Sequence, residues 1–324
     1  IDASSFEGGI LVRVAGNTGQ DGVFYWDENS NETPNNGTII GTGPGQWLRL
    51  FSGMVSVKWF GALGDNTTDD TSAIQAAIDF AETLNRAVFF PNGRYVVTSP
   101  ITCGVDLIGE GDAGSRIIVR RPFVGNVISN NSLGSYWTIK ELYFTHDVEA
   151  SNSLSGSCIY AKDVQFLLFE NVVTQVHGAT AIGIHIDGPA IGFASGQATI
   201  INPVITGAGA SGPYDGSWDA TASSCRLAGI KIGAGAKHVS IVNPFVASSY
   251  YGILFEGTSS KLSKQNTIVG GTFNTCDNCI YFGDYSQENT VIGTECVGYP
   301  VNIGAYDGDN AKHNMAYNVR AFGE

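Results

Sequence analysis

Three carboxylates follow a repeated strand-like phrase in the second half of this 324-residue chain. Asp187 follows Gly-Ile-His-Ile, Glu256 follows Gly-Ile-Leu-Phe, and Asp284 lies just beyond Cys-Ile-Tyr-Phe. A pair of carboxyl groups can hydrolyse a glycosidic bond, because one protonates the leaving oxygen while the other activates water or attacks the sugar. The three residues are therefore candidates for a catalytic pair, with solvated turn carboxylates as the alternative interpretation.

The distances between these carboxylates can be predicted if the repeated segments stack as neighbouring parallel strands. Strands ~4.8 Å apart place Asp187 and Glu256, two strands apart, at roughly 9–10 Å, and Glu256 and Asp284 at roughly 5–6 Å. Inverting glycosidases hold their two carboxyls ~6.5–9.5 Å apart and retaining ones ~5–5.5 Å apart. Spacing therefore leaves both mechanisms open. The acid of the pair needs a raised pKa, which burial or a neighbouring carboxylate supplies.

A second set of reactive side chains occupies the middle of the same phrases. His185, Lys231 and Tyr281 are expected in one outward-facing column together with Leu254 and Asn302, where they would bind substrate. The same imidazole, amine and phenol could instead serve a lyase, since β-elimination needs a base and cations that stabilise the anion formed. The chain has only 17 Lys and Arg residues, which favours hydrolysis over elimination of an acidic sugar.

Residues 207–226 lack a strand pattern and predict a long loop. Long loops in compact folds usually carry function. This one contains Tyr214, Asp215, Trp218 and Asp219. Aromatic planes pack against the C–H faces of sugar rings, and carboxylates accept hydrogen bonds from sugar hydroxyls. The composition suits one wall of a saccharide site; an ordinary surface loop is the alternative.

The phrases that carry these residues indicate a stack of parallel β coils. From Ile230 to Ile253 is 23 residues, and from Ile253 to Ile280 is 27. Repeats of this length, built from short β-branched strands and Gly or Asn turns, are typical of solenoids in which each coil buries its apolar face against its neighbours. If Ile184, these three residues and Val301 share one inward-facing register, the residues between them face solvent. An all-β, parallel β-helix is predicted.

The remaining segments divide the chain into three parts. Residues 1–53 have short strands separated by Asn, Gly and Pro turns, which predicts a small β module that could join the chain to a larger assembly. Residues 54–87 contain an apolar stripe at helical spacing, with Asp69 or Asp70 as the N-cap, and this helix is expected to cover the open end of the stack. Residues 88–324 are assigned to the parallel β-helix.

Composition argues against several classes of partner and cofactor. The formal net charge is −13, whereas a nucleic-acid-binding surface needs clustered Lys and Arg. No apolar run is long enough to span a bilayer, so no membrane insertion is expected. Asp and Asn are plentiful enough to build a Ca²⁺ site, but no EF-hand-like spacing appears. We therefore expect no cofactor and no metal.

A family resemblance rests on residues 57–78 and 88–96. They read Val-Lys-Trp-Phe-Gly-Ala-Leu-Gly-Asp, an Asp-capped helix, and Val-Phe-Phe-Pro-Asn-Gly-Arg-Tyr-Val. This pattern resembles the opening of bacteriophage tailspike proteins, polysaccharide depolymerases of the pectate-lyase-like, right-handed parallel β-helix superfamily. The usual Gly-Asp-Gly of that opening is Gly64-Asp65-Asn66 here. The resemblance implies that Asp65, Asp69 and Asp70 are structural, and it assigns no catalytic residue.

The resemblance also implies a biological setting. It is that of a homotrimeric spike in a phage virion, on the tail, which binds and usually cleaves capsule or lipopolysaccharide at the bacterial cell surface. An endo-acting glycoside hydrolase with paired carboxylates is the first expectation. A polysaccharide lyase and a non-catalytic, receptor-binding glycan spike are the alternatives. The expected partners are the polysaccharide, other copies of the chain, and phage tail or baseplate proteins.

Overall fold

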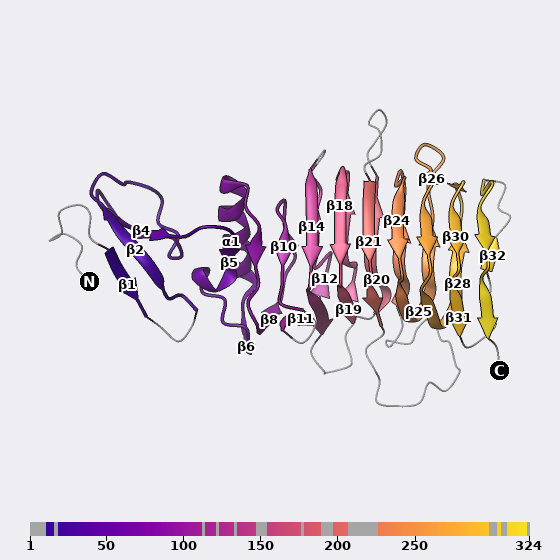
Figure 1. The fold of residues 1–324 in the computed structure, drawn as a ribbon, viewed down its shortest axis with the longest axis horizontal. Helices are drawn as coiled ribbons and strands as arrows, with labels where there is room; N and C mark the ends of the chain where they lie inside the picture. The colour runs from indigo at the N-terminus through magenta and orange to yellow at the C-terminus, as the bar shows by residue number, and fades with distance from the viewer. Residues whose placement is uncertain are drawn as a thin grey trace.

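A computed structural model shows an elongated molecule, with a small antiparallel sheet at its N-terminal end and a stack of parallel coils behind it (Figure 1). The structure describes residues 11–15, 19–111, 114–120, 123–132, 135–146, 154–175, 178–188, 197–206, 226–297, 303–305 and 310–322. The predicted all-β, parallel β-helix with one capping helix is confirmed.

The N-terminal sheet is antiparallel and has its own small core. Its strands, in spatial order, are β1 (Leu11–Val14), β2 (Gly22–Asp27), β4 (Gln46–Leu50) and β3 (Ile39–Ile40). Trp26 and Trp47 meet edge to face at 5.4 Å beside the buried Phe24. The buried Arg49 guanidinium donates three hydrogen bonds to backbone carbonyls and lies over the rings of Phe24 and Trp59, at 4.6 and 4.7 Å. Trp59 belongs to the 3₁₀ helix η2 (Val57–Phe60), so this guanidinium joins the module to the coils.

A ten-stranded parallel sheet forms one wall of the stack, with one strand for each coil. Its strands are β5 (Val55–Ser56), β7 (Val88–Phe89), β10 (Leu107–Ile108), β14 (Tyr136–Lys140), β18 (Phe166–Glu170), β21 (Gln197–Ile201), β24 (Val239–Val242), β27 (Thr267–Val269), β30 (Thr290–Ile292) and β33 (Met315–Tyr317). Because β5 pairs with β7, the coils begin near residue 55 rather than at residue 88. The two-residue strand β5 is too short to show an alternating pattern in the sequence.

A sixteen-stranded parallel sheet forms the remaining walls. One branch is β6 (Asp65–Asp69), β8 (Gly93–Val97), β11 (Ser115–Val119), β15 (Tyr143–His146), β19 (Val173–Gln175), β22 (Val204–Ile205), β31 (Glu295–Val297) and β34 (Arg320–Phe322). The other is β9 (Ile101–Thr102), β13 (Ile128–Asn130), β17 (Ser157–Lys162), β20 (Gly178–Asp187), β23 (Arg226–Ile232) and β32 (Ile303–Ala305). The long strands β25 (Phe245–Phe255) and β28 (Thr272–Phe282) pair with both branches and join them. Two short pairs are β12 (Phe123–Val124) with β16 (Leu154–Ser155), and β26 (Ser263–Lys264) with β29 (Ser286–Gln287).

The register between coils agrees with the sequence repeat except at its last step. The buried column runs through Ile184, Ile230, Ile253 and Ile280, as predicted. Ile280 then pairs with Ile303 and not with Val301. Tyr281 is therefore followed in its column by Gly304 and not by Asn302. A shift of two residues keeps the alternation of inward and outward positions, so the hydrophobic pattern alone cannot detect it.

Neighbouring coils turn at one corner with the same left-handed backbone conformation. The φ angle is 48° at Asn202, 52° at Asn243, and 68° at Gly270 and Gly293. Asn and Gly tolerate this conformation better than other residues, which explains why the repeated phrase ends in either Asn-Pro or Gly. The Asn243 side-chain amide also donates to Asn202 Oδ1 at 3.2 Å, and Asn202 donates to Asn171 Oδ1 at the same distance.

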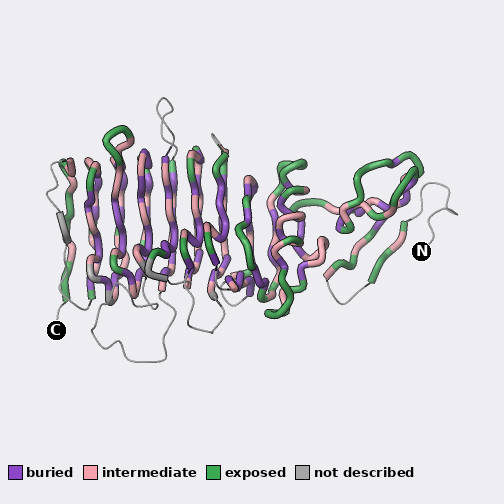
Figure 2. The backbone as a smooth tube through the Cα atoms, turned by 180° about the vertical axis from the view of Figure 1, so that it is seen from behind, coloured by how far each residue is buried: buried purple, intermediate pink, exposed green. Residues whose placement is uncertain are grey.

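A second asparagine ladder lies inside the stack. Asn266 Nδ2 donates to Asn289 Oδ1 at 2.9 Å, and Asn289 Nδ2 donates to Asn314 Oδ1 at 2.9 Å. Asn266 and Asn289 are almost fully buried, and buried amides are costly unless they are hydrogen-bonded. The ladder therefore ties successive coils together, while the buried stretches of the backbone repeat from coil to coil in Figure 2.

One helix, α1 (Thr71–Leu84), covers the N-terminal end of the stack with four buried residues, Ile74, Ala77, Ile78 and Ala81. Asp69 caps it, because Asp69 Oδ1 accepts from the Thr71 backbone N–H at 3.0 Å. Asp70 occupies the N-cap position, but its buried carboxylate turns away and accepts from the Leu63 and Gly64 N–H groups at 2.7 and 3.1 Å. The cap and the tight turn before it are therefore fixed by adjacent aspartates.

Replacing Asp70 should destabilise this capped end. Asp70→Ala leaves the Leu63 and Gly64 N–H groups without their buried acceptor, and we expect the free energy of unfolding to fall by about 1–3 kcal/mol. Chemical denaturation measures the change. Asp79→Ala on the exposed side of the same helix is the matched control and should change stability by less than about 0.5 kcal/mol. Equal effects of the two substitutions would contradict the role given to Asp70.

Candidate active site

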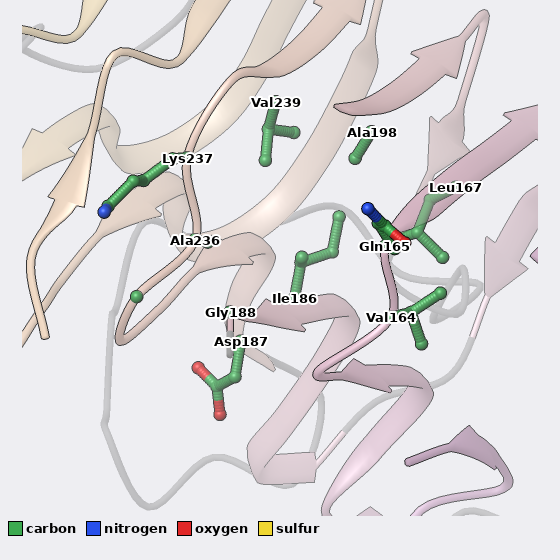
Figure 3. A pocket seen from close by; sticks show the side chains of 11 residues that line it. Val164, Gln165, Leu167, Ile186, Asp187, Gly188, Ala198, Ala236, Lys237 and Val239 are labelled. Atoms are coloured by element: carbon green, nitrogen blue, oxygen red, sulfur yellow. The ribbon is translucent and has the colours of Figure 1, made fainter. Parts of the chain in front are cut away.

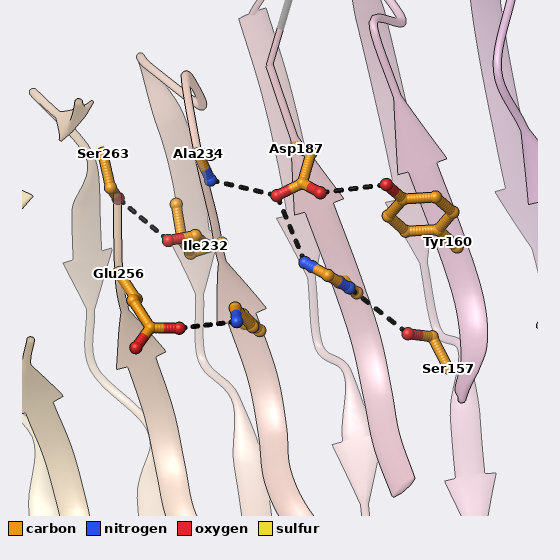
Figure 4. Close-up of polar contacts among 9 residues, drawn as sticks. Ser157, Tyr160, Asp187, Ile232, Ala234, Glu256 and Ser263 are labelled. Atoms are coloured by element: carbon orange, nitrogen blue, oxygen red, sulfur yellow. Dashed lines mark hydrogen bonds and ion pairs between the residues drawn. The ribbon is translucent and has the colours of Figure 1, made fainter. Parts of the chain in front are cut away.

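Three residues predicted to bind substrate, His185, Lys231 and Tyr281, lie in one column on the outer side of adjacent strands. Strand pairing places Tyr160 on β17, His185 on β20, Lys231 on β23, Leu254 on β25 and Tyr281 on β28 side by side. Figure 4 shows the polar part of this surface. The spacing of parallel strands makes this a column along the long axis, which suits an extended polymer better than a small molecule.

Asp187, at the end of β20, is the most highly coordinated carboxylate of this surface. It accepts hydrogen bonds from Tyr160 Oη at 2.9 Å, His185 Nε2 at 3.2 Å and the Ala234 backbone N–H at 3.0 Å (Figure 4). A Cβ atom added to Gly233 would lie 2.0 Å from Asp187 Oδ1. The glycine of the next coil therefore leaves the space that the carboxylate occupies.

These contacts determine the charge of Asp187. Burial opposes its ionisation, but the hydrogen bonds from His185 and Tyr160 and the positive charge of Lys231 outweigh burial and hold the pKa of Asp187 below its ordinary value. Asp187 is therefore a carboxylate at neutral pH. It lacks the raised pKa expected of the acid in a catalytic pair.

Glu256 forms an ion pair with Lys231. Its Oε2 accepts from Lys231 Nζ at 2.6 Å, with 44% of the Glu256 side chain and 20% of the Lys231 side chain exposed. The Glu256 N–H donates to the Ile232 carbonyl, so Glu256 lies two strands from Asp187 on the same side. Asp284 is exposed, and its backbone carbonyl accepts from the Gly257 N–H at 2.8 Å. Its carboxylate makes no hydrogen bond or ion pair with the residues that the structure describes.

An apolar strip runs beside the charged groups. Ile182, Ala228 and Leu254 are buried outside the main core, with Tyr251 and Tyr281 packed against them. The two tyrosine rings lie 4.8 Å apart. Leu254 was expected to face solvent but is only 4% exposed, because the neighbouring tyrosines cover it. Burial and the neighbouring Tyr250 raise the pKa of Tyr251 to about 12, so this phenol stays neutral and can donate a hydrogen bond.

Both ring nitrogens of His185 are engaged. Nε2 faces Asp187, and Nδ1 lies 3.4 Å from the hydroxyl oxygen of the buried Ser157. Tyr160 donates to Asp187, and burial and the negative charge of Asp187 raise the pKa of Tyr160 above its ordinary value. Neither group is arranged as a free base toward solvent. Both orient and stabilise the carboxylate of Asp187.

Several of these partners were not predicted from the sequence. Tyr160 could have been found, because Cys158-Ile159-Tyr160 repeats the Cys-Ile-Tyr phrase that carries Tyr281. The backbone donor of Ala234 leaves no comparable signal in the sequence. The predicted loop residues Tyr214, Asp215, Trp218 and Asp219 lie outside the described residues, as does Asn302.

A small cavity lies at the end of β20, next to Asp187 (Figure 3). Its volume is about 20 Å³, and its lining includes Val164, Ile186, Ala198 and Val239. This is about the volume of one water molecule. A sugar does not fit there, so a substrate must reach Asp187 from the outer side.

Among the described residues, no group of three or more His, Cys, Asp or Glu side chains is arranged to hold a metal ion. Within the same part of the chain, no helix has the length and apolar character needed to cross a membrane.

Parts of this chain are similar in sequence to known proteins. The chain is 30% identical over 166 residues to a probable glucan endo-1,3-beta-glucosidase of Arthroderma benhamiae, a match that covers 43% of this chain and 19% of that protein. It is 37% identical over 89 residues to a capsule K3-specific depolymerase of Klebsiella phage KP32, which covers 22% of this chain and 10% of the phage protein. The matches therefore span at most about a fifth of these curated relatives.

A solved structure and a family model cover more of the chain. The enzymatically active domain of tailspike protein 2 from bacteriophage CBA120 matches 99% of this chain and 51% of its own, with a TM-score of 0.67 and 18% identity. At this identity the likeness shows the fold, and it confirms the resemblance to tailspike β-helices. Residues 54–297 match the family model described as rhamnogalacturonase A/epimerase, pectate lyase-like. The chain belongs to this pectate-lyase-like family.

Proposed function

We propose that this protein degrades a bacterial surface polysaccharide, a capsule or an O-chain, and that it does so as an endo-acting glycoside hydrolase. The observation that carries the proposal is the ionised, partly buried Asp187, held by three donors beside a second carboxylate and two tyrosines. The matches to a glucosidase and a capsule depolymerase support the same class of reaction.

In the proposed reaction Asp187 is the base and Glu256 is the acid. Two intervening strand spacings place their backbones roughly 9–10 Å apart, near the ~6.5–9.5 Å carboxyl separation of inverting enzymes. Asp187 takes a proton from a water molecule that attacks the anomeric carbon. Glu256 gives a proton to the departing glycosidic oxygen, so water is added across the broken bond. The exposed Asp284, one coil further, is the alternative acid.

Lys231 and two tyrosines would position the substrate beside the carboxylates. Lys231 Nζ lies 2.6 Å from Glu256 Oε2, so the ammonium orients this carboxylate and would donate a hydrogen bond to a sugar hydroxyl that comes within reach. Tyr251 and Tyr281 offer the surface on which a sugar ring packs.

The neighbouring groups make a lyase the second candidate. Tyr160, His185 and Lys231 lie in one column, as β-elimination requires of its base and its anion-stabilising cation. However, both nitrogens of His185 have partners and the pKa of Tyr160 is raised. These observations favour hydrolysis. A glycan-binding spike without catalysis is the third candidate.

The biological setting belongs to the same proposal. The tailspike fold and the phage depolymerase match support a place on a phage tail, with action at the bacterial cell surface. Self-association as a homotrimer and attachment to tail or baseplate proteins follow the same analogy. The residues Tyr214, Asp215, Trp218 and Asp219 are proposed to add a wall to the site.

Product analysis tests the proposed reaction directly. Purified capsules and lipopolysaccharides from a bacterial strain panel are incubated with the protein, and the products are separated by size and analysed by mass spectrometry. Oligosaccharides heavier by one water than the corresponding internal residues are expected, since hydrolysis adds water across the bond. Unsaturated, ultraviolet-absorbing ends would identify a lyase. Binding with no shortening of any polysaccharide would contradict both enzymatic assignments.

Removing either proposed catalytic carboxylate should nearly abolish activity. Asp187→Asn and Glu256→Gln are each expected to lower kcat by about 10²–10⁴-fold, the range supplied by acid–base groups. Glu170→Gln is the matched control, because Glu170 forms a similar 2.8 Å ion pair with Lys140 on the ten-stranded sheet. It should retain activity. An active Glu256→Gln with an inactive Asp284→Asn would move the acid to Asp284.

The fall of kcat/KM at acidic pH should reflect the protonation of Asp187. Because the pKa of Asp187 is lowered, kcat/KM should persist below the ordinary aspartate range and fall only as pH drops through that lowered pKa. Tyr160→Phe removes one donor to the carboxylate, raises its pKa and should move this fall to higher pH. Tyr317→Phe, on an exposed tyrosine elsewhere in the stack, serves as the control. A fall at unchanged pH in Tyr160→Phe would remove Asp187 from the role of base.

A further inference from the structure

A second hollow, larger than the cavity next to Asp187, lies near the N-terminal end of the stack. Its volume is about 440 Å³, within the range typical of small-molecule sites. Three successive coils contribute to it, where the strands β7, β10 and β14 begin. Its lining includes Arg86, Gly104, Asp106 and Tyr136.

Tyr136 supplies a flat wall of this hollow. Its side chain is 69% exposed, and its ring stacks on Phe166 of the next coil at 4.7 Å with an interplanar angle of 14°. Phe166 covers one face of the ring, and the hollow includes groups of the two preceding coils. Among the residues that the structure describes, no other ring stacks on Tyr136. Tyr136 therefore presents an exposed aromatic plane that a second ring supports.

Polar groups of both signs border the plane. Asp106 Oδ1 accepts from the Thr138 backbone N–H at 2.7 Å, which fixes the carboxylate and leaves its second oxygen to other donors. Arg86 Nη1 donates to the Gly53 carbonyl at 2.8 Å, which uses one of the five guanidinium N–H groups. The Glu82 carboxylate also lies beside the hollow, where its Oε1 accepts from the Gly104 N–H at 2.6 Å. Two carboxylates and one guanidinium disfavour an anionic ligand, so the hollow favours a neutral one. Its remaining acceptors and donors match the hydroxyl groups of a sugar.

We infer that this hollow is a glycan-binding site without a catalytic role, and that it takes a neutral pyranose ring stacked on the exposed plane of Tyr136. The choice of a sugar rests on the proposed function, since a polysaccharide substrate would supply the ring. The site lies two coils from the coil of Asp187, because β14 pairs with β18 and β18 with β21. It would hold the polymer at a second point while a different segment is cut.

Saturation-transfer NMR on the full chain tests this site with free glucose, galactose, mannose and N-acetylglucosamine, and with glucuronic acid as the charged comparison. We expect at least one neutral sugar to bind. Tyr136→Ala should weaken that binding about five- to tenfold, which is the loss of one aromatic contact. Tyr136→Phe keeps the plane and should retain binding. Tyr317→Ala, at another exposed tyrosine, is the control, and melting curves establish that each variant is folded.

Several results would overturn the inference. They are the absence of binding by every neutral sugar, unchanged binding in Tyr136→Ala, equal binding of glucuronic acid, and loss of binding in Tyr281→Ala instead. The outcome is separable from that of the proposed function. If the protein cuts no polysaccharide but binds a neutral sugar through Tyr136, the catalytic proposal fails and this site stands. If cutting occurs and Tyr136→Ala binds sugars like the wild type, only this site is lost.

Discussion

The fixed register between parallel coils is the constraint on which the rest of the molecule depends. A coil cannot bury its apolar side alone, so each one is stable only against its neighbours. A slip of one residue would turn every buried side chain outward. Two features oppose such a slip: the left-handed corner at Asn202, Asn243 and Gly270, and the buried amide ladder through Asn266 and Asn289. Residues far apart in sequence consequently meet as neighbours.

The environment of Asp187 is a product of that register. Its donors come from three coils: Tyr160 from the coil before, His185 from its own, and Ala234 from the coil after. Gly233 leaves room for the carboxylate. A partly buried charge is tolerated here because hydrogen bonds and a nearby ammonium replace the water it loses. Among the described residues, strands and turns of three coils build the surroundings of this carboxylate, so its position depends on the register between them.

Much of this arrangement could be predicted because the repeat is long and regular. The alternation around Ile230, Ile253 and Ile280 was sufficient to give the fold and to place His185 beside Lys231. Side-chain direction could not be predicted in the same way. Glu256 turns to Lys231 and Asp187 to Tyr160 because of local donors, and one-dimensional patterns do not record which of several neighbours a flexible side chain selects.

Other differences have equally physical causes. Leu254 alternates correctly to the outer side, yet Tyr251 and Tyr281 bury it, because large rings at neighbouring positions can form a small core outside the main one. Ile280 pairs with Ile303, whereas Val301 was predicted. Both candidates are apolar and lie two positions apart, so either pairing fits the alternating pattern of the sequence. In the first coil, the two-residue strand β5 is recognisable only by its partner.

The uniform corner has a consequence for how such a chain can change its length. Asn243 and Gly270 both have a positive φ angle and follow paired strands of adjacent coils. The chain therefore turns in the same direction in both coils. A segment that begins at one corner and ends at the next is thus an interchangeable unit. Duplicating or deleting such a unit would lengthen or shorten the outer surface by ~4.8 Å and leave the flanking columns aligned. The length of the outer surface can therefore change in steps of one coil while the remaining columns keep their register.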